Sequence, residues 1–215
     1  MLGIVGKTGA GKTTLLRQLL RQYPLGDGVF SYGENKLIEL EQAEWQKLIA
    51  YVPQDHILFS RSVRENIAFG KPHATDEEIM ASVRTASFEH DLQNMELGLE
   101  TLVGEKGVAI SGGQKQRISL ARALIKEPEI LILDDCLSAV DAKTEQNIIS
   151  NIKQARVNTT TIISTHRLSA IKDADEIIVL DEGVITERGT HEELLGLQGW
   201  YYQQYLRQEL KEGDV

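Results

Sequence analysis

Near the start of the chain stands the stretch Gly6-Lys7-Thr8-Gly9-Ala10-Gly11-Lys12-Thr13. It fits the pattern G-x-x-x-x-G-K-[ST], whose glycines let successive backbone N–H groups curl around a phosphate. Leu2, Ile4 and Val5 predict a buried strand before it, and four leucines at helical spacing predict a helix after it. A helix that begins here points its positive end at the same phosphate. The flanking sequence therefore supports a phosphate-binding loop.

The residues of this loop predict a bound nucleotide. Lys12 supplies a movable cation for the terminal phosphates, and the Thr13 hydroxyl can ligate Mg²⁺. The alternative is a plain glycine-rich turn before a helix. A chance match to the pattern in a chain of this length is expected only roughly one time in a hundred, and the flanking strand and helix lower that figure further.

Length and composition narrow the class of protein. The 215 residues, 41% of them hydrophobic, suffice for one core with at most a small attached subdomain. The net charge of −9 argues against a nucleic-acid surface, which needs a basic stripe. A single cysteine, Cys136, excludes an internal disulfide, and no apolar run approaches the about 18 residues of a membrane span. We expect a soluble, cytoplasmic, acidic domain without a signal peptide.

Apolar, β-rich runs alternate with amphipathic helical segments, which predicts an α/β fold with a mainly parallel sheet flanked by helices. We expect strands at Gly3–Val5, Ile49–Val52, Ile130–Leu133, Thr160–Ser164 and Glu176–Leu180. The last of these is expected to form a hairpin with residues 184–188. We expect helices at Lys12–Gln22, Asp76–Ala86, Gly112–Lys126, Ala142–Ala155 and His191–Glu209.

Strand signals vanish between residues 71 and 107, where short helical patterns dominate. We therefore expect one domain over residues 1–215. Its core comprises residues 1–70 and 108–215, with an incomplete antiparallel β subdomain, and residues 71–107 form an inserted helical subdomain.

Two further segments have the chemistry of a phosphate site. The apolar run from Glu129 ends in Asp134, and an acid at the end of a strand beside a phosphate-binding loop holds Mg²⁺ through water. Twenty residues earlier, Ser111-Gly112-Gly113-Gln114 predicts a serine-capped helix start that an anion can approach closely. The alternatives are a strand with a capping Asp and a generic helix cap. The second is disfavoured because each glycine weakens a helix by about 1 kcal/mol.

These motifs occur in a recognisable order: Gly6–Thr13, Gln54, Ser111–Gln114, Asp134, Ser138-Ala139-Val140-Asp141 and His166. Together they resemble the nucleotide-binding domain of ATP-binding cassette (ABC) transporters, a P-loop NTPase fold, over essentially the whole chain. The resemblance is closest to multidrug and peptide exporters, in segments 51–55, 59–70, 103–107, 164–169 and 188–194.

The resemblance implies a role for each motif. ATP and Mg²⁺ would be bound by the residues from Gly6 to Thr14, with Thr13, Gln54 and Asp134 as the metal-binding set. Gln54 would reach the attacking water and sense the membrane domain, and His166 would lie near the γ-phosphate. Ser111–Gln114 would contact the γ-phosphate of ATP bound to the opposite subunit, and Asp141 would lie at the contact between subunits. ATP would thus close two domains onto each other.

Asp135 departs from the family pattern, because the resemblance implies a glutamate after the Mg²⁺ acid to polarise the attacking water. A shorter carboxylate is expected to lose much of the ~10²–10⁴-fold that such a base contributes. The alternative is that Asp substitutes with modest loss. With an intact Ser111–Gln114, the chain resembles the degenerate-site subunit of heterodimeric bacterial multidrug exporters. We therefore expect low intrinsic ATPase activity and a heterodimer, with a homodimer as the alternative.

A second departure concerns what precedes Met1. In this family, early strands and an aromatic residue that stacks on adenine lie upstream of the loop, and a transmembrane domain belongs to the same polypeptide. We expect the missing strands to weaken nucleotide affinity and to leave a sheet edge exposed.

The expected function is ATP-driven export at the cytoplasmic face of the cell membrane, with no nucleic-acid partner. The alternatives are a soluble ABC-type ATPase not linked to transport and a P-loop kinase. A kinase would need neither the Ser111–Gln114 helix nor the Ser138–Asp141 segment, and both are present.

Overall fold

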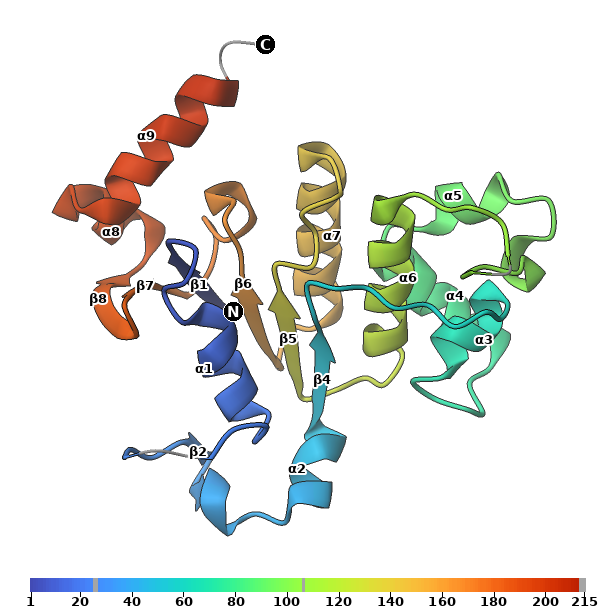
Figure 1. Cartoon of the computed structure of the whole chain (residues 1–215), viewed down its shortest axis with the longest axis horizontal. Helices are drawn as coiled ribbons and strands as arrows, with labels where there is room; N and C mark the ends of the chain where they lie inside the picture. The colour runs from blue at the N-terminus through green and yellow to red at the C-terminus, as the bar shows by residue number, and fades with distance from the viewer. Residues whose placement is uncertain (25–26, 106, 213–215) are drawn as a thin grey trace. The chain divides into compact units, whose positions relative to one another are not determined.

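The computed structural model describes residues 1–24, 27–105 and 107–212. Lys106 of the predicted exporter-like segment 103–107 lies outside the described residues, as do residues 25–26 and 213–215 of the predicted domain. Its main sheet has the strand order β4-β5-β6-β1-β7-β8 (Figure 1). The strands of this sheet are β1 (Leu2–Gly6), β4 (Ile49–Val52), β5 (Ile130–Asp134), β6 (Thr160–Ser164), β7 (Glu176–Asp181) and β8 (Val184–Gly189).

Helices alternate with these strands along the chain. The longer ones are α1 (Lys12–Leu19), α2 (Gln42–Leu48), α3 (Val63–Ala68), α4 (Asp76–Thr85), α5 (Glu89–Gln93), α6 (Gly112–Leu124), α7 (Ala142–Ala155), α8 (His191–Leu197) and α9 (Trp200–Glu212). Short 3₁₀ turns are η1 (Leu37–Glu39), η2 (Gly98–Glu100) and η3 (Leu168–Ala170). A small antiparallel hairpin joins β2 (Ser31–Tyr32) to β3 (Asn35–Lys36).

The chain divides into two compact units. The first comprises Met1–Ile49, Ile132–Asp134 and Thr160–Val215, and the second comprises Ala50–Leu131 and Asp135–Thr159. The predicted helical subdomain at residues 71–107 lies within the second unit, and its status as a separate subdomain stays a prediction.

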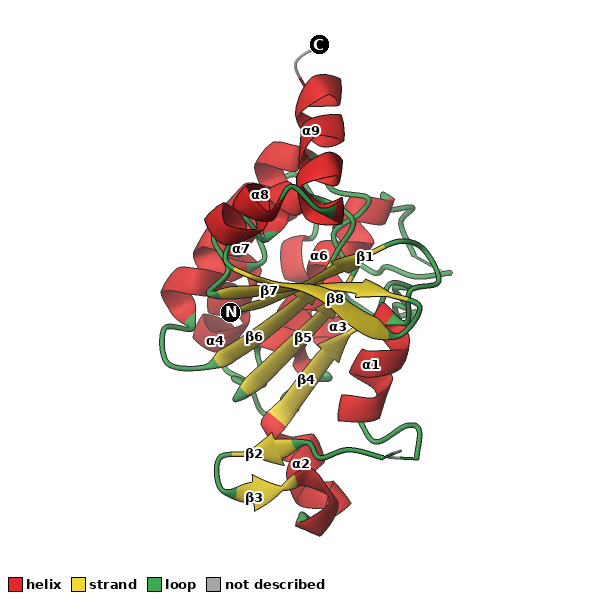
Figure 2. Cartoon of the chain, turned by 90° about the vertical axis from the view of Figure 1, so that its left-hand side faces the viewer, coloured by secondary structure: helices red, strands yellow, loops and turns green. Residues whose placement is uncertain are grey.

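The first unit is built on β1, which pairs in parallel with both β6 and β7. Ile4 lies opposite Ile178 in one register and Ser164 in the other, and Ile4 and Val5 are almost completely buried. Continuous apolar runs of this kind form strands that are covered on both faces. β8 closes the sheet antiparallel to β7, as predicted, and Figure 2 shows the two strands beside β1.

The hairpin β2–β3 belongs to the first unit and lies next to α2 in Figures 1 and 2. The Tyr32 ring meets Trp45 of α2 edge-on, with 5.7 Å between the ring centroids. The Trp45 indole N–H also donates to the carbonyl of Leu19, 2.7 Å away, at the end of α1. One buried indole therefore connects the hairpin region to the helix that follows the phosphate loop.

The second unit is held together by helices with apolar residues at helical spacing. α6 packs against α3 and α4, and it buries Ile118 and Leu120 completely. α3 and α4 each begin with a complete capping box, at Ser62 and Thr75, which satisfies the N–H groups that a helix start leaves unpaired. Arg122 of α6 donates to the backbone and side chain of Asn66 in α3, at 2.8 Å each.

The prediction of one helix over residues 191–209 is wrong, because the structure breaks it into α8 and α9. Gln198 ends α8 in the left-handed region with φ of 52°. Gly199 follows, and a Cβ there would come within 2.4 Å of the Glu187 carboxylate. That carboxylate accepts hydrogen bonds from the backbone N–H groups of Trp200 and Tyr201, so a residue of β8 caps α9. Helical spacing continues across the break and hides it in the sequence.

The other predicted elements are confirmed, with small shifts at some ends. The strands Ile49–Val52 and Thr160–Ser164 and the helix Ala142–Ala155 match at both ends. The helix predicted over Lys12–Gln22 is shorter and ends at Leu19. No helix in the part of the chain that the structure describes is long and apolar enough to cross a membrane.

Candidate functional site

The loop between β1 and α1 has the backbone that its glycines predict. Gly6, Gly9 and Gly11 have φ angles of 151°, 84° and 100°, a region that favours residues without a Cβ. A Cβ on Gly6 would lie 2.1 Å from the Leu180 carbonyl oxygen, whereas a Cβ on Gly9 would meet nothing within 4 Å. Gly6 is therefore required for close packing on β7, and Gly9 lies at the open side of the loop, where a ligand can approach.

Lys12 lies inside the curve of this loop. Its Nζ donates to the carbonyl oxygens of Gly6 and Lys7, at 2.8 and 3.0 Å, and the residue is only 8% exposed. These contacts hold a cation at the first turn of α1, next to the half-buried Thr13 and the exposed Thr14. A buried cation beside a helix N-terminus provides the charge that a polyphosphate needs.

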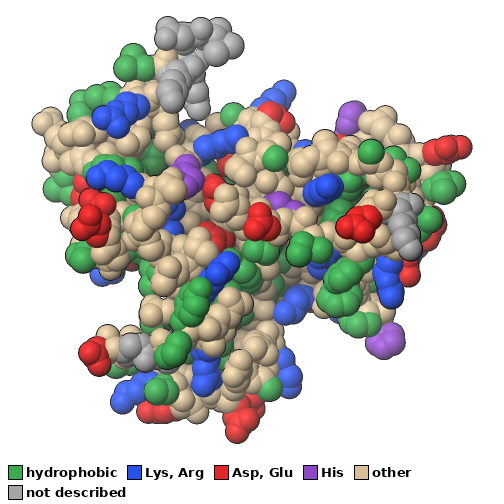
Figure 3. Space-filling view, in the orientation of Figure 1, with side chains coloured by type: hydrophobic (Ala, Val, Ile, Leu, Met, Phe, Trp, Pro, Cys, Tyr) green, Lys and Arg blue, Asp and Glu red, His purple; other side chains and the backbone are tan. Residues whose placement is uncertain are grey.

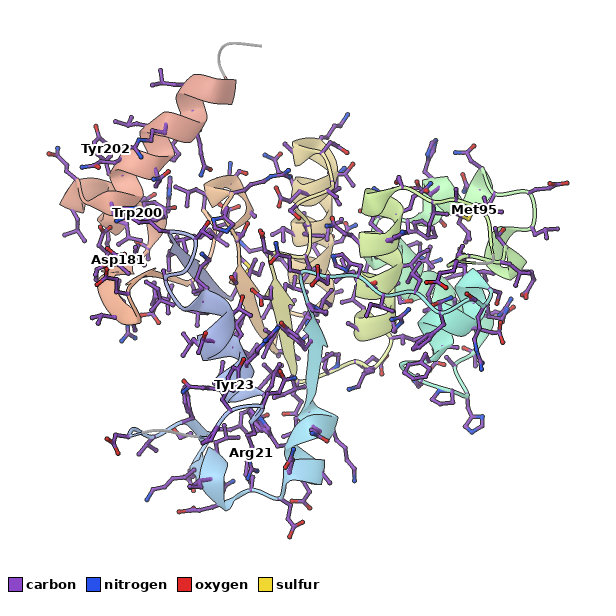
Figure 4. The ribbon with its side chains drawn as sticks, in the orientation of Figure 1. Arg21, Tyr23, Met95, Asp181, Trp200 and Tyr202 are labelled. Atoms are coloured by element: carbon purple, nitrogen blue, oxygen red, sulfur yellow. The ribbon has the colours of Figure 1, made fainter. Side chains whose placement is uncertain are left out.

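The turn between β7 and β8 supports the loop from the side. The Gly183 N–H donates to the Ala10 carbonyl at 2.9 Å, and a Cβ on Gly11 would lie 3.6 Å from the Gly183 Cα. Lys7 pairs with Asp181, labelled in Figure 4, at 3.5 Å on the surface. The sequence predicted a hairpin here but not its contact with the loop.

Asp134 and His166 also belong to the first unit. Asp134 ends β5 and is only 2% exposed, as expected for an acid at the carboxyl end of a buried strand. His166 follows β6 and is exposed. β1 and β6 are parallel, and the Thr165 N–H donates to the Ile4 carbonyl at 3.2 Å, so the loop and His166 lie at the same edge of the sheet.

This arrangement is suited to a Mg²⁺ ion bound together with a nucleotide. Among residues 1–24, 27–105 and 107–212, no group of three or more His, Cys, Asp and Glu side chains could hold a metal ion alone. Mg²⁺ commonly takes one or two protein ligands and completes its shell with water and substrate phosphates. Thr13 and the buried Asp134 are oxygen donors of that kind.

The second glycine-rich helix start, in the second unit, is built differently. Ser111 caps α6, and its Oγ accepts from the Gln114 N–H at 3.1 Å. The Gln114 side chain accepts in turn from the Ser111 N–H at 2.8 Å and donates to Asp91 at 3.0 Å. Asp91 also pairs with Arg117 at 2.7 Å. This helix start is therefore preorganised by its own side chains before any ligand arrives.

The segment after β5 packs against this helix start. Gln116 accepts from the Ala139 N–H at 3.0 Å, and a Cβ on Gly113 would lie 3.1 Å from the Ala139 carbonyl. Asp141 caps α7 by accepting from the Thr144 N–H at 2.9 Å. Hydrogen bonds from the side chain and backbone of Thr144 lower the pKa of the Asp141 carboxyl. The structure thus brings the segments 111–114 and 138–141 together.

Asp135 and Gln54, both in the second unit, complete the predicted set. Asp135 has φ of 47°, a left-handed conformation that Asp tolerates better than most residues. Gln54 is exposed just after β4. Two residues later, burial lowers the pKa of the His56 imidazole, and the Asp55 carboxylate partly opposes this shift. The His56 ring is therefore neutral at neutral pH.

A cavity of about 830 Å³ lies beside the α6 helix start in the second unit. Its lining includes Gln114 and the apolar side chains of Met95, Leu97 and Leu102. Figure 4 labels Met95, far along the chain from the phosphate loop. On the face drawn in Figure 3, acidic and basic side chains are interspersed.

The phosphate loop and the acid at the end of β5 lie within a region that matches a known family. The model described as ABC transporter matches residues 1–138, which is more than half of the chain. The chain belongs to the ABC transporter family. The resemblance to the nucleotide-binding domain of ABC transporters is confirmed, as are the P-loop NTPase fold and the membership of an ATPase family. The likeness to a degenerate-site subunit stays a prediction.

Two relatives of this ABC domain carry names that refer to multidrug resistance. It is 59% identical over 209 residues to a probable multidrug resistance ABC transporter ATP-binding/permease protein, YheI, of Bacillus subtilis (strain 168). It is 47% identical over 211 residues to the multidrug resistance-like ATP-binding protein MdlA of Escherichia coli (strain K12). These matches cover 97% and 98% of the chain but 36% of each relative.

A solved structure agrees with this assignment. A bacterial Atm1-family ABC exporter with ATP bound superposes with a TM-score of 0.92 at 39% identity, over 96% of this chain and 36% of that one. The chain is therefore a nucleotide-binding domain of exporter type that spans about a third of the length of such proteins.

Several residues that support the site could not be found from motifs. Asp91 holds both Gln114 and Arg117, although it lies 23 and 26 residues away from them. Gly183 supports the phosphate loop from the far end of the chain. The only local signal was the turn sequence around Gly183, which predicts a hairpin but no partner.

Proposed function

We propose that this ABC domain binds ATP with Mg²⁺ and hydrolyses it in a pair of such domains that close around the nucleotide. The observation that carries the proposal is the contrast between its two glycine-rich helix starts. α1 begins at Gly11 with no side-chain cap, whereas α6 begins at Ser111 with a complete capping box. An uncapped helix start with a buried lysine is suited to grip a phosphate chain.

In this proposal, the residues from Gly6 to Thr14 hold the phosphates of ATP in the domain's own site. Backbone N–H groups and the Lys12 ammonium donate to phosphate oxygens, and Thr13, Asp134 and Gln54 hold Mg²⁺. When bound, the metal supplies positive charge against the phosphate oxygens. His166 donates to the γ-phosphate from the loop after β6.

The capped helix start serves the partner's site rather than its own. The segment Ser111-Gly112-Gly113-Gln114, in which Ser111 and Gly112 are exposed, presents a positive helix end to the γ-phosphate of ATP held by the second domain. Asp141 lies near this end because segment 138–141 packs on α6. ATP thus supplies the charge that both domains share, and its hydrolysis lets them part.

Asp135 makes the domain's own site the slower one. A general base must reach the proton that it removes, and Asp is one methylene shorter than Glu. The intact helix start at Ser111 completes a faster site on a different partner. We therefore propose a heterodimer, in which this domain holds its ATP and hydrolyses it slowly.

We place the domain at the cytoplasmic face of a membrane, joined to a transmembrane domain of the same polypeptide. The support is that this chain matches about a third of a relative whose printed name is an ATP-binding/permease protein. ATP-driven closure then powers the export of a substrate.

Pairing through the α6 start can be tested with one charge. Gly112→Asp places an anion where the partner's γ-phosphate should lie. An acidic side chain at a helix N-terminus is favourable, so we expect the variant to remain folded. We expect sedimentation to show that the ATP-dependent association of this domain with its partner domain is lost. The affinity of the domain's own phosphate loop for ATP should be unchanged. Gly196→Asp, at an open position of α8, is the matched control and should associate normally. Association by the Gly112→Asp variant would contradict the proposal.

The asymmetry is tested in the assembled transporter. Asp135→Glu should raise the number of hydrolytic sites from one to two, counted by nucleotide trapping, while Asp135→Asn should leave the fast site working. If Asp135→Asn abolished all turnover as completely as removal of the partner's catalytic acid, the asymmetric assignment would be wrong.

A further inference from the structure

The loop that carries His166 is attached to the C-terminal helix. The side-chain amide of Gln208 in α9 donates from Nε2 to the His166 carbonyl oxygen at 2.8 Å. The same amide accepts through Oε1 from the Leu168 N–H at 2.9 Å. Both contacts lie within the first unit, and they span 42 and 40 residues of sequence.

The two hydrogen bonds act as a clamp. They bind backbone groups on both sides of Arg167, as a neighbouring strand would, and they therefore fix the loop's direction as well as its position. The Arg167 N–H is itself bonded to the Thr165 hydroxyl at 3.0 Å, and Leu168 is buried. The backbone around His166 is therefore held at several points, whereas His166 itself is exposed.

α9 is fixed firmly enough to serve as the support. The Glu187 carboxylate caps its start, and Tyr201 is completely buried. The Tyr201 hydroxyl lies 2.8 Å from His191 Nδ1, and burial raises the pKa of this tyrosine. Figure 4 shows Trp200 and Tyr202 at the same end of the helix. Gln208 thus belongs to a helix whose first turn is held by β8 and α8.

We propose that Gln208 is a positioning residue, which holds the His166 loop so that the imidazole meets the γ-phosphate. This rests on the proposed function of His166. A clamp on the backbone fixes the point from which the His166 side chain reaches toward the phosphate, and a displacement of about 1 Å at such a site can cost 100-fold in rate. Through Gln208, the placement of α9 sets the geometry of the nucleotide site.

Hydrogen exchange tests whether the clamp exists, with no nucleotide present. In the 215-residue chain, Gln208→Ala should make the Leu168 amide exchange about fivefold faster, because one hydrogen bond is lost. Gln203→Ala, at an exposed glutamine of the same helix, is the matched control and should leave this rate unchanged. Unchanged exchange in Gln208→Ala would overturn the clamp.

Nucleotide preference tests what the clamp does. Gln208→Ala should lower the ratio of ATP to ADP affinity several-fold and leave ADP affinity unchanged, because only ATP has the γ-phosphate. Gln208→Glu keeps the acceptor for Leu168 but places a carboxylate oxygen against the His166 carbonyl. In this variant the Leu168 amide should exchange as slowly as in the wild type, while the ratio of ATP to ADP affinity should still fall. This combination separates a positioning role from a general loss of folding.

A double-mutant cycle assigns the effect to His166. In a His166→Ala background, Gln208→Ala should lower the ratio no further. If His166→Ala lowers the ratio and Gln208→Ala does not, the positioning role is overturned and the proposed function stands. If His166→Ala leaves the ratio unchanged, the proposed contact of His166 with the γ-phosphate is refuted, and the positioning role with it.

Discussion

Two helices of this domain begin with glycines at a predicted phosphate contact, and they begin in opposite ways. At α1, the N-cap is Gly11 in the left-handed region with φ of 100°, and no side chain caps the helix. At α6, the N-cap is Ser111 in an extended conformation, and Ser111 and Gln114 satisfy each other's backbone N–H groups. One helix start lacks a capping partner of its own, and the other is complete.

The difference separates two ways of meeting the same anion. An uncapped start leaves N–H donors to an external phosphate, so folding and ligand binding share these groups. A capped start is stable without a ligand and presents its dipole and the exposed backbone of Gly112. The first suits a nucleotide bound tightly by its own domain, and the second suits a nucleotide that arrives on a partner and must leave again.

The largest expected effect is at Gly6. Gly6→Ala places a Cβ 2.1 Å from the Leu180 carbonyl at a φ of 151°, so β1, β7 or the loop must shift. We expect the free energy of unfolding to fall by about 3 kcal/mol. Gly9→Ala has open space and should cost only about 1 kcal/mol, from its φ of 84°. Chemical denaturation measures both, and equal losses would contradict the packing role of Gly6.

Next in size is the cation of the uncapped start. Lys12→Ala should weaken ATP binding about 100-fold, measured by calorimetry, because it removes a buried charge from the loop. Lys7→Ala removes an exposed lysine of the same loop, and it should change the affinity by less than about threefold because water screens its charge. A similar loss in both variants would show that net charge alone attracts the nucleotide.

A smaller effect is expected at the capped start. Ser111→Ala should lower the free energy of unfolding by about 1 kcal/mol, the usual value of an N-cap, and leave the ATP affinity of the domain's own loop unchanged. Ser150→Ala, at an exposed serine within α7, should leave stability nearly unchanged. A loss of ATP affinity in Ser111→Ala alone would mean that the two helix starts do not serve separate sites.

The smallest effect is a pH dependence at Asp141, next to the capped start. The pKa of its carboxyl is lowered in the folded state, so its contribution to stability is present above the unfolded value of 3.8 and is lost as the pH falls through the folded value. The stability difference between the wild type and Asp141→Asn should therefore shrink below pH 3.8. Glu96→Gln, at an exposed acid, is the charge control, and equal pH dependence in both would contradict the assignment.

Much of the fold could be predicted because its signals are local. Ala142–Ala155 forms the predicted helix because Asp141 caps it and its apolar residues recur at helical spacing. The chemistry of the phosphate loop follows from the pattern Gly6–Thr13, since glycine favours the φ angles found at Gly6, Gly9 and Gly11, and the contact at Gly6 leaves no room for a Cβ. The break at Gln198 was missed, because the capping Glu187 lies on another element and helical spacing continues past it.

Residue types along the chain were sufficient to determine that this protein grips a phosphate, that it has a mainly parallel sheet, and that it belongs to the ABC family. Each motif and each predicted strand or helix is visible in a short stretch of sequence, and the order of the motifs along the chain indicates the family. Tertiary structure alone decided that Gly183 supports the phosphate loop, that Asp91 holds the α6 start, and that Gln208 clamps the His166 backbone. These contacts join residues 23 to 173 positions apart, and their formation depends on how the whole chain packs.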